Sequence, residues 1–564
     1  MLCQSHNGAE GNRTPDLCSA IAALYQLSYS PDSVGATIHE RISTSHSLLK
    51  VVTKVESVNC DAVLPGTRSV TQTSVPQTPV RFPPNTMHSL DSPFVRDQLA
   101  LRTFSLNGVR AQPEGEFVLY WMQSTQRLVE NWALRAATLD ADRLGKPLVI
   151  YQGLDPHYEH ASDRIHTMIV GNAAELDALA RQLGYCYLFN LRRSRADDGR
   201  VVDRLAARAT LIVTDAFPTA GIAERSARVA ARVGCRMLAV ESHGVVPSAI
   251  CTKEEFAART IRPKLAGLLD LMLEPVEDKP PRKTVSDALR RSLELESLDF
   301  ARISVSTEIA RCDIDHTVAP VLATRPGHAA ARARLDAFCS DALADYAERR
   351  NDPSDPDGSS RLSPYLHFGQ ISAAEVARVV RDRGAPEQVQ KFLDELVTWR
   401  ELSLNFCVRN AAYGTLDGLP NWVRENMARH AADERTHVYD RATFEAAATH
   451  HPLWNAAQRE LKSTGLMHNV MRMYWGKYIV LWSRTYADAL DTMVALNNRY
   501  GLDGRDPSSY GGIQWCLGKF DRPWTRRPVL GTIRYMSLDL AYKKFNARAY
   551  ERRWTPEPDM LLLK

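Results

Sequence analysis

Short, continuous apolar runs alternate with stretches of helical periodicity from about residue 115 onward. Runs of this kind, without polar alternation, are typical of strands that are buried on both faces of a sheet. Strands separated by helices favour a parallel sheet. The pattern therefore predicts an α/β domain, with a Rossmann-like parallel sheet and helices on both faces. Its strands are expected at residues 117–121, 147–151, 185–189, 209–214 and 236–241.

After residue 305 the pattern of apolar positions becomes helical almost throughout. Two adjacent prolines, Pro280 and Pro281, stand before this change, and proline excludes a helix interior. We therefore predict an α/β domain over residues 87–275, an interdomain linker over 276–305 and an all-α domain over 306–564. Helices of the second domain are expected at residues 329–349, 372–382, 387–405, 443–449, 468–485 and 486–500.

Residues 1–86 are rich in Ser, Thr, Pro, Asn and Val and show no sustained period, so we expect a disordered or artefactual extension. Residues 11–30 resemble spurious translations of structural-RNA genes, in which case translation starts at Met87. A targeting peptide is the alternative. The segment contains acidic residues, however, and lacks a basic start followed by an apolar core.

Composition narrows the class of protein. A chain of 564 residues exceeds the usual size of one hydrophobic core, which agrees with two domains. No apolar run reaches the roughly 18 residues that a membrane span needs, so a soluble, cytoplasmic protein is expected. The ten cysteines are scattered without a CxxC pair, which predicts neither a metal site nor a disulfide framework. The net charge of +4 does not by itself indicate a polyanionic partner.

The loop at residues 359–372, SSRLSPYLHFGQIS, carries the first candidate chemistry. Hydroxyls, backbone amides and an arginine surround a proline-broken turn that leads into a helix with Ser372 as its expected N-cap. This combination suits a diphosphate, although an ordinary capped loop is the alternative for the segment taken alone. The loop resembles the flavin-binding signature of the photolyase and cryptochrome family. The resemblance implies FAD contacts from Ser359, Ser360, Arg361, Leu362 and Ser363.

Further segments resemble class II cyclobutane pyrimidine dimer photolyases in the same order and at similar spacing. They are FLDEL (392–396), REL (400–402), NFC (405–407), HPLWNAAQ (451–458), GLMH (465–468), MRMYWGK (471–477), LDGRDP (502–507), RPVLG (527–531) and IRYM (533–536). Residues 257–264 also resemble the domain junction of this family. The resemblance covers roughly residues 115–553. It implies an enzyme whose reduced, anionic FAD, once photoexcited, passes an electron to a pyrimidine dimer, splits it and recovers the electron.

The same resemblance assigns residues at the flavin. Asn497 would face the flavin N5, Asp503 would accept from the ring or its sugar-alcohol chain, and Arg472 would balance the local charge. Asp506 belongs to the same motif and is expected at the cofactor. The alternatives are a helix-terminal polar residue for Asn497 and a plain turn for residues 503–507.

On the lesion side, Glu395 is the expected carboxyl group that donates to a thymine carbonyl, with a pKa raised by burial. An ordinary ion pair with Arg400 is the alternative. Trp399 and Trp515 are candidate walls against which the flipped dimer stacks, with Met473 filling the remaining space. Core packing is the alternative for these aromatic residues.

Three tryptophans match the class II relay that reduces the resting flavin. Trp475 and Trp482 are seven residues apart, which on a helix places both on one face, separated by roughly 10 Å of rise. Trp454 completes the set. Core packing is the competing explanation for each residue by itself.

Basic residues concentrate near the C-terminal end. Residues 519–553 contain ten Lys or Arg and three acidic residues. Such a stretch suits phosphate contact and strand separation, with Arg527 and Arg534 as expected DNA contacts. A solvated basic face is the alternative. Three aromatic residues are interleaved with the charges: Trp524, Tyr535 and Tyr542.

The expected partner is UV-damaged DNA that contains pyrimidine dimers, bound by a monomer without membrane contact. A cryptochrome-like photoreceptor with the same flavin and tryptophans is the rival function, but the lesion-side residues match the repair class and no long tail follows Trp554. A flavoprotein that binds DNA without catalysis is a third possibility. A second, antenna chromophore is left open, because no motif decides it; a deazaflavin is the expected one.

Overall fold

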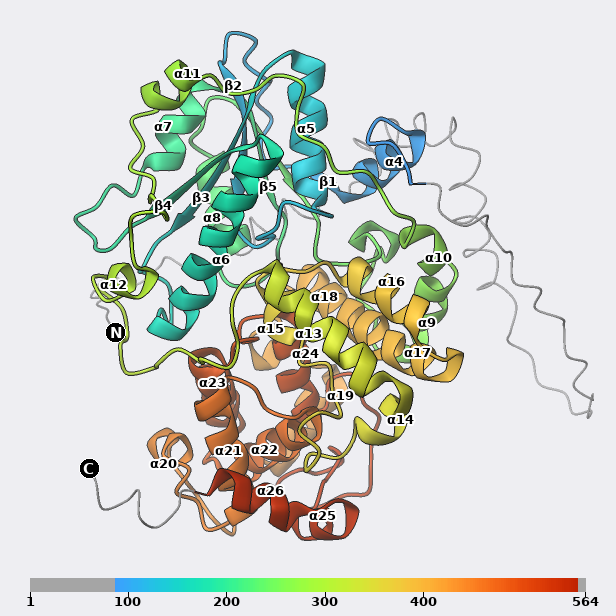
Figure 1. Cartoon of the computed structure of the whole chain (residues 1–564). Coiled ribbons are helices and arrows are strands. Elements are labelled where there is room, and N and C mark those ends of the chain that lie inside the picture. Colours follow the sequence, from blue (N-terminus) through green and yellow to red (C-terminus); the bar gives the residue numbers. More distant parts are fainter. Residues whose placement is uncertain (1–86, 556–564) are drawn as a thin grey trace, which may run out of the picture. The chain divides into compact units, whose positions relative to one another are not determined.

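The computed structural model describes residues 87–555 (Figure 1). The predictions for residues 1–86 lie outside the described residues. Within residues 87–555, no helix is both long enough and apolar enough to cross a membrane. In the same part of the chain, no group of three or more His, Cys, Asp or Glu is placed to hold a metal ion.

A six-stranded sheet forms the first half of the described chain, with strand order β1-β6-β5-β2-β3-β4. Strands β2 to β6 pair in parallel, and the short β1 pairs antiparallel with β6. The predicted α/β class is confirmed, and each of the five predicted strands is present; β1 was not predicted. The bounds are β1 (Thr103–Ser105), β2 (Phe117–Met122), β3 (Leu148–Leu154), β4 (Cys186–Leu191), β5 (Ala209–Asp215) and β6 (Arg236–Val240).

Both faces of this sheet are covered. All residues of β2 and β5 are buried, although successive side chains of a strand point to opposite faces. Continuous apolar runs are therefore required by burial on two sides. The accompanying helices include α4 (Pro93–Arg102), α5 (Trp132–Leu144), α6 (Asp163–Leu183), α7 (Val201–Arg208) and α8 (Ile222–Ala230).

The segment between the sheet and the helical region contains four short helices: α9 (Ala258–Ala266), α10 (Leu269–Met272), α11 (Asp287–Ser292) and α12 (Val305–Ile309). Leu293, inside the predicted linker 276–305, packs into the apolar core on one face of the sheet. This part of the linker therefore associates with the α/β region. The domain bounds remain a prediction.

The second half of the described chain is helical, as predicted. Residues 387–405 form one continuous helical run with a π-helical middle, whereas the expected helix 329–349 divides into two. The bounds are α13 (His328–Asp341), α14 (Tyr346–Arg349), α15 (Ser363–His367), α16 (Ala373–Arg383), α17 (Pro386–Leu393), η4 (Asp394–Trp399), α18 (Arg400–Arg409), α19 (Asn421–His430), α20 (Arg441–Glu445), α21 (Pro452–Thr464), α22 (Asn469–Trp482), α23 (Tyr486–Tyr500), α24 (Pro507–Cys516), α25 (Leu538–Lys544) and α26 (Ala547–Trp554).

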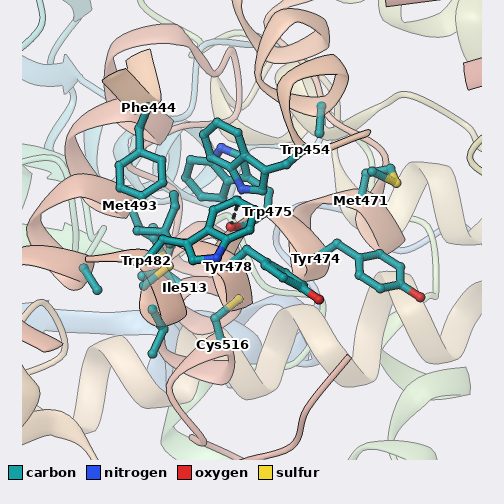
Figure 2. Packing of buried hydrophobic residues seen from close by; sticks show 14 of the residues in the cluster. Phe444, Trp454, Met471, Tyr474, Trp475, Tyr478, Trp482, Met493, Ile513 and Cys516 are labelled. Carbon is teal, nitrogen blue, oxygen red and sulfur yellow. Dashed lines mark hydrogen bonds between the residues drawn. The ribbon is translucent and has the colours of Figure 1, made fainter. Parts of the chain in front are cut away.

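An aromatic core joins α21, α22, α23 and α24. Figure 2 shows Trp454, Trp475 and Trp482 gathered there with Phe444 and Tyr478. Burial of such large side chains contributes much of the stability of a helical region. This core therefore forms a rigid support for the loops that surround the candidate site.

Candidate cofactor and substrate site

A cavity of about 420 Å³ opens in the helical region. Its walls come from the loop before α15, from η4, from the start of α22, from α24 and from the end of α26. Most of the predicted cofactor and lesion residues meet here. They are Ser359, Ser360, Arg361, Leu362, Ser363, Glu395, Trp399, Arg472, Asp503, Asp506 and Trp515.

The signature loop reaches the cavity in a strained conformation. Arg361 has a φ of 53°, in the left-handed region that non-glycine residues seldom adopt. The guanidinium of Arg334 donates to the carbonyl oxygens of Ser360, at 2.9 Å, and Ser359, at 3.2 Å, and so holds the loop. Ser372 accepts from the backbone N–H of Ala374, so the predicted N-cap is present. Strain supported from outside the loop is typical of a binding site.

The turn after α15 packs tightly against the carboxyl end of β2. Gly369 has a φ of 64°, and a Cβ there would lie 2.3 Å from the carbonyl oxygen of Ser124. Arg127 donates to the carbonyl oxygen of Gly369 at 3.0 Å. Ligands commonly bind at the carboxyl ends of strands in open α/β sheets. Here, the signature loop itself occupies the end of the central strand, which fixes the loop relative to the sheet.

Arg472, Asn497 and Asp503 form one polar network. Nη2 of Arg472 lies 3.0 Å from Oδ1 of Asp503, and its Nη1 donates to Oδ1 of Asn497 at 3.3 Å. Asn497 is 2% exposed, at the end of α23. The structure therefore connects the three residues predicted at the flavin ring. Asn497 does not line the cavity itself; it contacts Arg472, which does.

Asp506 places a buried negative charge at the start of α24. It caps this helix by accepting from Ser508 N at 2.8 Å, and it lies 3.4 Å from Nδ1 of His367 and 3.8 Å from Arg400. Burial alone would raise the pKa of Asp506, but the bond from His367 and the charge of Arg400 hold that pKa well below its usual range. Burial lowers the pKa of His367. Asp506 is therefore ionised at neutral pH.

A π-helical segment, η4, carries two of the lesion-side candidates. π-Helical turns are rare and occur frequently at functional sites. This one brings Glu395 and Trp399 to the cavity. The ring of Trp399 stacks on that of Trp515, with centroids 4.7 Å apart and an angle of 17° between the planes. The two indoles therefore lie face to face without a gap between them, so that only their outer faces and edges form an aromatic surface.

Glu395 was expected in a buried setting without a flanking cation, and the structure instead places two basic side chains beside it. Its carboxylate lies 2.8 Å from Nη2 of Arg350 and 3.2 Å from Nζ of Lys391. Lys391 is four residues earlier on the helical run, the spacing at which side chains meet. The proposed alternative partner, Arg400, points instead to Asp506 and to the carbonyl oxygen of His243.

The three tryptophans predicted to form the relay lie together in the aromatic core (Figure 2). Nε1 of Trp454 donates to the carbonyl oxygen of Trp475 at 3.0 Å, and the rings of Trp454 and Trp482 are 6.2 Å apart. Nε1 of Trp475 donates to Gln458 at 2.8 Å. Trp454, from α21, therefore bridges the two tryptophans of α22. Met473 packs against the same aromatic core and is absent from the cavity lining among the described residues.

The basic segment is only partly available to a ligand. Trp524 is 39% exposed, with Arg522 at 4.9 Å and Arg534 at 5.1 Å from its ring centroid. Arg527 covers the ring of Tyr535 at 4.7 Å. Lys519, in contrast, is buried and paired with Glu254. Exposed arginines therefore accompany Trp524, among them Arg522, Arg526 and Arg527.

Known photo-lyases are similar to this chain over most of its length. The deoxyribodipyrimidine photo-lyase of Methanothermobacter thermautotrophicus is 34% identical over 460 residues, which cover 80% of this chain and 98% of the relative. The chain belongs to the photolyase family. The photo-lyases of Arabidopsis thaliana and Potorous tridactylus are 36% and 31% identical, over 77% and 79% of this chain and 88% and 82% of their own lengths. A family model for DNA photolyase matches residues 118–282.

Solved structures of photolyases share the fold. A class III photolyase from Agrobacterium tumefaciens superposes with a TM-score of 0.57 at 18% identity, over 79% of this chain and 88% of that one. A photolyase from Sulfolobus tokodaii, solved with two FAD molecules, gives a TM-score of 0.56 at 17% identity, over 78% and 90% of the two chains. These structures confirm the predicted fold, and the photo-lyase relatives confirm the expected photolyase and cryptochrome family.

Two buried carboxyl groups of this photolyase-family chain were missed by the sequence reasoning. Glu460 lines the cavity and accepts from the hydroxyl of Tyr550, and burial raises its pKa. Glu401 accepts from the backbone N–H groups of Val245, at 2.6 Å, and Val246, at 3.3 Å, and burial raises its pKa to about 7. Both lie within or beside segments that carried the family resemblance, but local sequence does not show that a carboxyl group is buried.

Proposed function

We propose that the chain is a class II deoxyribodipyrimidine photolyase, which splits cyclobutane pyrimidine dimers in UV-damaged DNA by light-driven electron transfer from reduced FAD. One observation carries the proposal. The signature loop, the Arg472–Asp503 pair and the Trp399–Trp515 surface surround a single cavity. Relatives that cover most of the chain are named deoxyribodipyrimidine photo-lyases. We expect a monomer that acts on DNA in the cytoplasm.

The residues present fit FAD. Gly512 faces the cavity, and no atom lies within 4 Å of where its Cβ would be, so a flat ring can approach α24. Nε of Arg400 is buried without a hydrogen-bond partner among the described residues. The hydroxyls of the signature loop and the guanidinium of Arg361 suit a diphosphate. A bound flavin would supply light absorption and one-electron chemistry.

Arg472, Asn497 and Asp503 form a polar network whose charges cancel, and we propose that it lies beside the flavin ring. Arg472 and Asp503 compensate each other, and Asn497 adds an uncharged amide held by Arg472. Asn497 does not line the cavity, so in this proposal it acts by positioning Arg472, which does. The Arg472–Asp503 pair would stabilise an anionic ring, when one is bound, through fixed charges that need no rearrangement.

On the lesion side, the Trp399–Trp515 surface offers a stacking platform for an extruded dimer. Glu395 lies on the same wall with Arg350 and Lys391 beside it. We keep Glu395 as the residue that contacts the pyrimidine carbonyl groups. The two cations that accompany it would stabilise the negative charge that develops on the dimer.

The exposed Trp524, with Arg522 and Arg534 over its ring, is the proposed DNA contact outside the cavity. An aromatic side chain between arginines can stack on bases while the guanidinium groups bind phosphates. Arg527 contributes from the other end of the same loop. Binding through such groups weakens as salt is added.

We place the second chromophore, a deazaflavin, beside Tyr158. Its hydroxyl lies 3.2 Å from Nδ1 of His166, and Arg505 covers its ring at 5.2 Å. Nε2 of His160, Nε2 of His166 and Nε of Arg505 are buried without a hydrogen-bond partner among the described residues. Such atoms cost free energy unless a ligand or water satisfies them. The test is the absorption of protein produced with and without a deazaflavin source.

The deciding experiment measures dimers in UV-irradiated DNA incubated with the reduced protein under blue light and in darkness. Light-dependent loss of dimers supports the proposal. FAD binding and photoreduction without dimer loss would instead indicate a photoreceptor. DNA binding without turnover would indicate a non-catalytic flavoprotein. Asn497→Ala and Glu395→Ala should each reduce repair while FAD absorption is retained.

A further inference from the structure

Two tyrosines contact the outermost tryptophan of the proposed relay, at the end of α22. The ring of Tyr478 is 4.7 Å from that of Trp482, and the ring of Tyr439 is 5.8 Å away. Both distances allow an electron to pass to Trp482. The environment of the two hydroxyl groups therefore decides which tyrosine can be oxidised, because a phenol that loses an electron becomes a strong acid and must release its proton.

Among residues 87–555, no base is hydrogen-bonded to the hydroxyl of Tyr478. Its hydroxyl accepts from Leu538 N at 3.0 Å and lies 3.2 Å from the hydroxyl of Tyr535. Burial raises the pKa of Tyr478. Neither partner takes up a proton at neutral pH, so oxidation of Tyr478 would leave a buried positive charge.

Tyr439 has a base in contact. Its hydroxyl lies 2.7 Å from Nδ1 of His450 and accepts from the backbone N–H of the same residue at 3.2 Å. With an oxygen lone pair used by that N–H, the phenolic hydrogen is directed to Nδ1. His450 is exposed to solvent and its ring is 4.7 Å from that of Trp482. A proton taken up there can leave to water.

His450 is neutral when the relay operates near neutral pH. Partial burial, together with the nearby His437 and His451, lowers the pKa of His450. His437 stacks on it at 3.8 Å, and the ring of His451 is 6.2 Å away. In the neutral tautomer that carries its hydrogen on Nε2, the lone pair of Nδ1 accepts from the phenol.

We propose that Tyr439 is the terminal electron donor of the relay and that His450 is the base that accepts its proton. The step rests on the proposed function, which leaves an electron hole on Trp482. One electron passes from Tyr439 to the Trp482 radical cation, and the phenolic proton passes to Nδ1 of His450. The products are neutral Trp482, a neutral Tyr439 radical and a protonated His450, so charge and atoms balance.

The consequence is a slower return of the electron. A hole on Trp482 carries a positive charge and can recombine directly, whereas the neutral Tyr439 radical must recover a proton before it can be reduced to tyrosine. Tyr439 is only half-buried, so an external reductant can reach it. Tyr439 and His450 thus reduce the fraction of flavin reduction events that are lost to return of the electron.

The test is flash spectroscopy of the protein with oxidised FAD bound. In the wild type we expect a tryptophan radical that gives way to a neutral tyrosyl radical. Tyr439→Phe should lose the tyrosyl signal, while the matched control Tyr478→Phe, at the same tryptophan, should retain it. His450→Ala should lose it too, and added imidazole should restore it, which a purely structural role would not allow. The yield of tyrosyl radical should fall as the pH is lowered through the pKa of His450.

A readout that needs no light is the imidazole titration of His450 by NMR, which should change in Tyr439→Phe and stay unchanged in Tyr478→Phe. An unchanged tyrosyl signal in Tyr439→Phe would overturn the proposal, as would its loss in Tyr478→Phe alone. A tryptophan radical without any tyrosyl radical in the wild type would refute this inference but leave the relay intact. The lack of any tryptophan radical would refute the relay itself.

Discussion

The substitution Gly369→Ala tests whether the position of the signature loop depends on its contact with the sheet. The Cβ of alanine would lie 2.3 Å from Ser124 O, 2.8 Å from Thr125 Cα and 3.1 Å from Gln126 N. All three atoms belong to the backbone that follows β2, so no side chain can rotate away. The turn must therefore move, and the signature loop before it must move as well.

The magnitude follows from two separate costs. A left-handed conformation costs a non-glycine residue about 1–2 kcal/mol, and forced overpacking costs about 1–3 kcal/mol more. The matched control is Gly145→Ala, because Gly145 has a φ of 63° and no atom within 4 Å of its Cβ position. The control carries the conformational cost without the clash.

The assay compares the FAD dissociation constant and the thermal unfolding midpoint of both variants with those of the wild type. Both variants should unfold at lower temperature, and Gly369→Ala at the lowest. Only Gly369→Ala should bind FAD more weakly, by about tenfold or more if at least ~1.4 kcal/mol of the clash falls on the loop. Equal FAD affinity in Gly369→Ala and Gly145→Ala would refute the reasoning that the sheet positions the loop.

Three further predictions concern charge and electron transfer. Burial raises the pKa of Glu401 from 4.5 to about 7, so the folded state keeps a proton that the unfolded chain releases, and stability falls as the pH rises through this window. Glu401→Gln should remove about 3 kcal/mol of that pH dependence in urea unfolding; an unchanged slope would contradict the assignment. Trp475→Phe should abolish photoreduction of FAD, yet retain repair once the flavin is reduced chemically; normal photoreduction would exclude it from the relay. Arg534→Gln should weaken DNA binding and reduce the slope of log affinity against log salt by about one, and an equal slope would place Arg534 away from the phosphates.

Some of the residues that line the cavity were predicted from the sequence, and some of their contacts were not. The signature loop, Arg472, Asp503 and Trp515 were identified from the family resemblance, and in the structure all of them line the same cavity. The partners of Glu395 were not identified. Arg350 belongs to a different segment, so its 2.8 Å contact is a product of tertiary packing. Asn497 was expected to face the cofactor directly, and the structure places Arg472 between it and the cavity.

The sequence alone determined the class of each half of the chain and the order of the five parallel strands, because hydrophobic period, caps and proline positions act over a few residues. It also indicated which motifs are expected to carry the chemistry. Only the tertiary structure decided the protonation of the carboxyl groups and the stacking of Trp399 on Trp515. It likewise decided that Tyr439, unlike Tyr478, has a base within hydrogen-bond distance. Burial and charge at a side chain are set by segments distant in sequence, and no local pattern encodes which of them will meet.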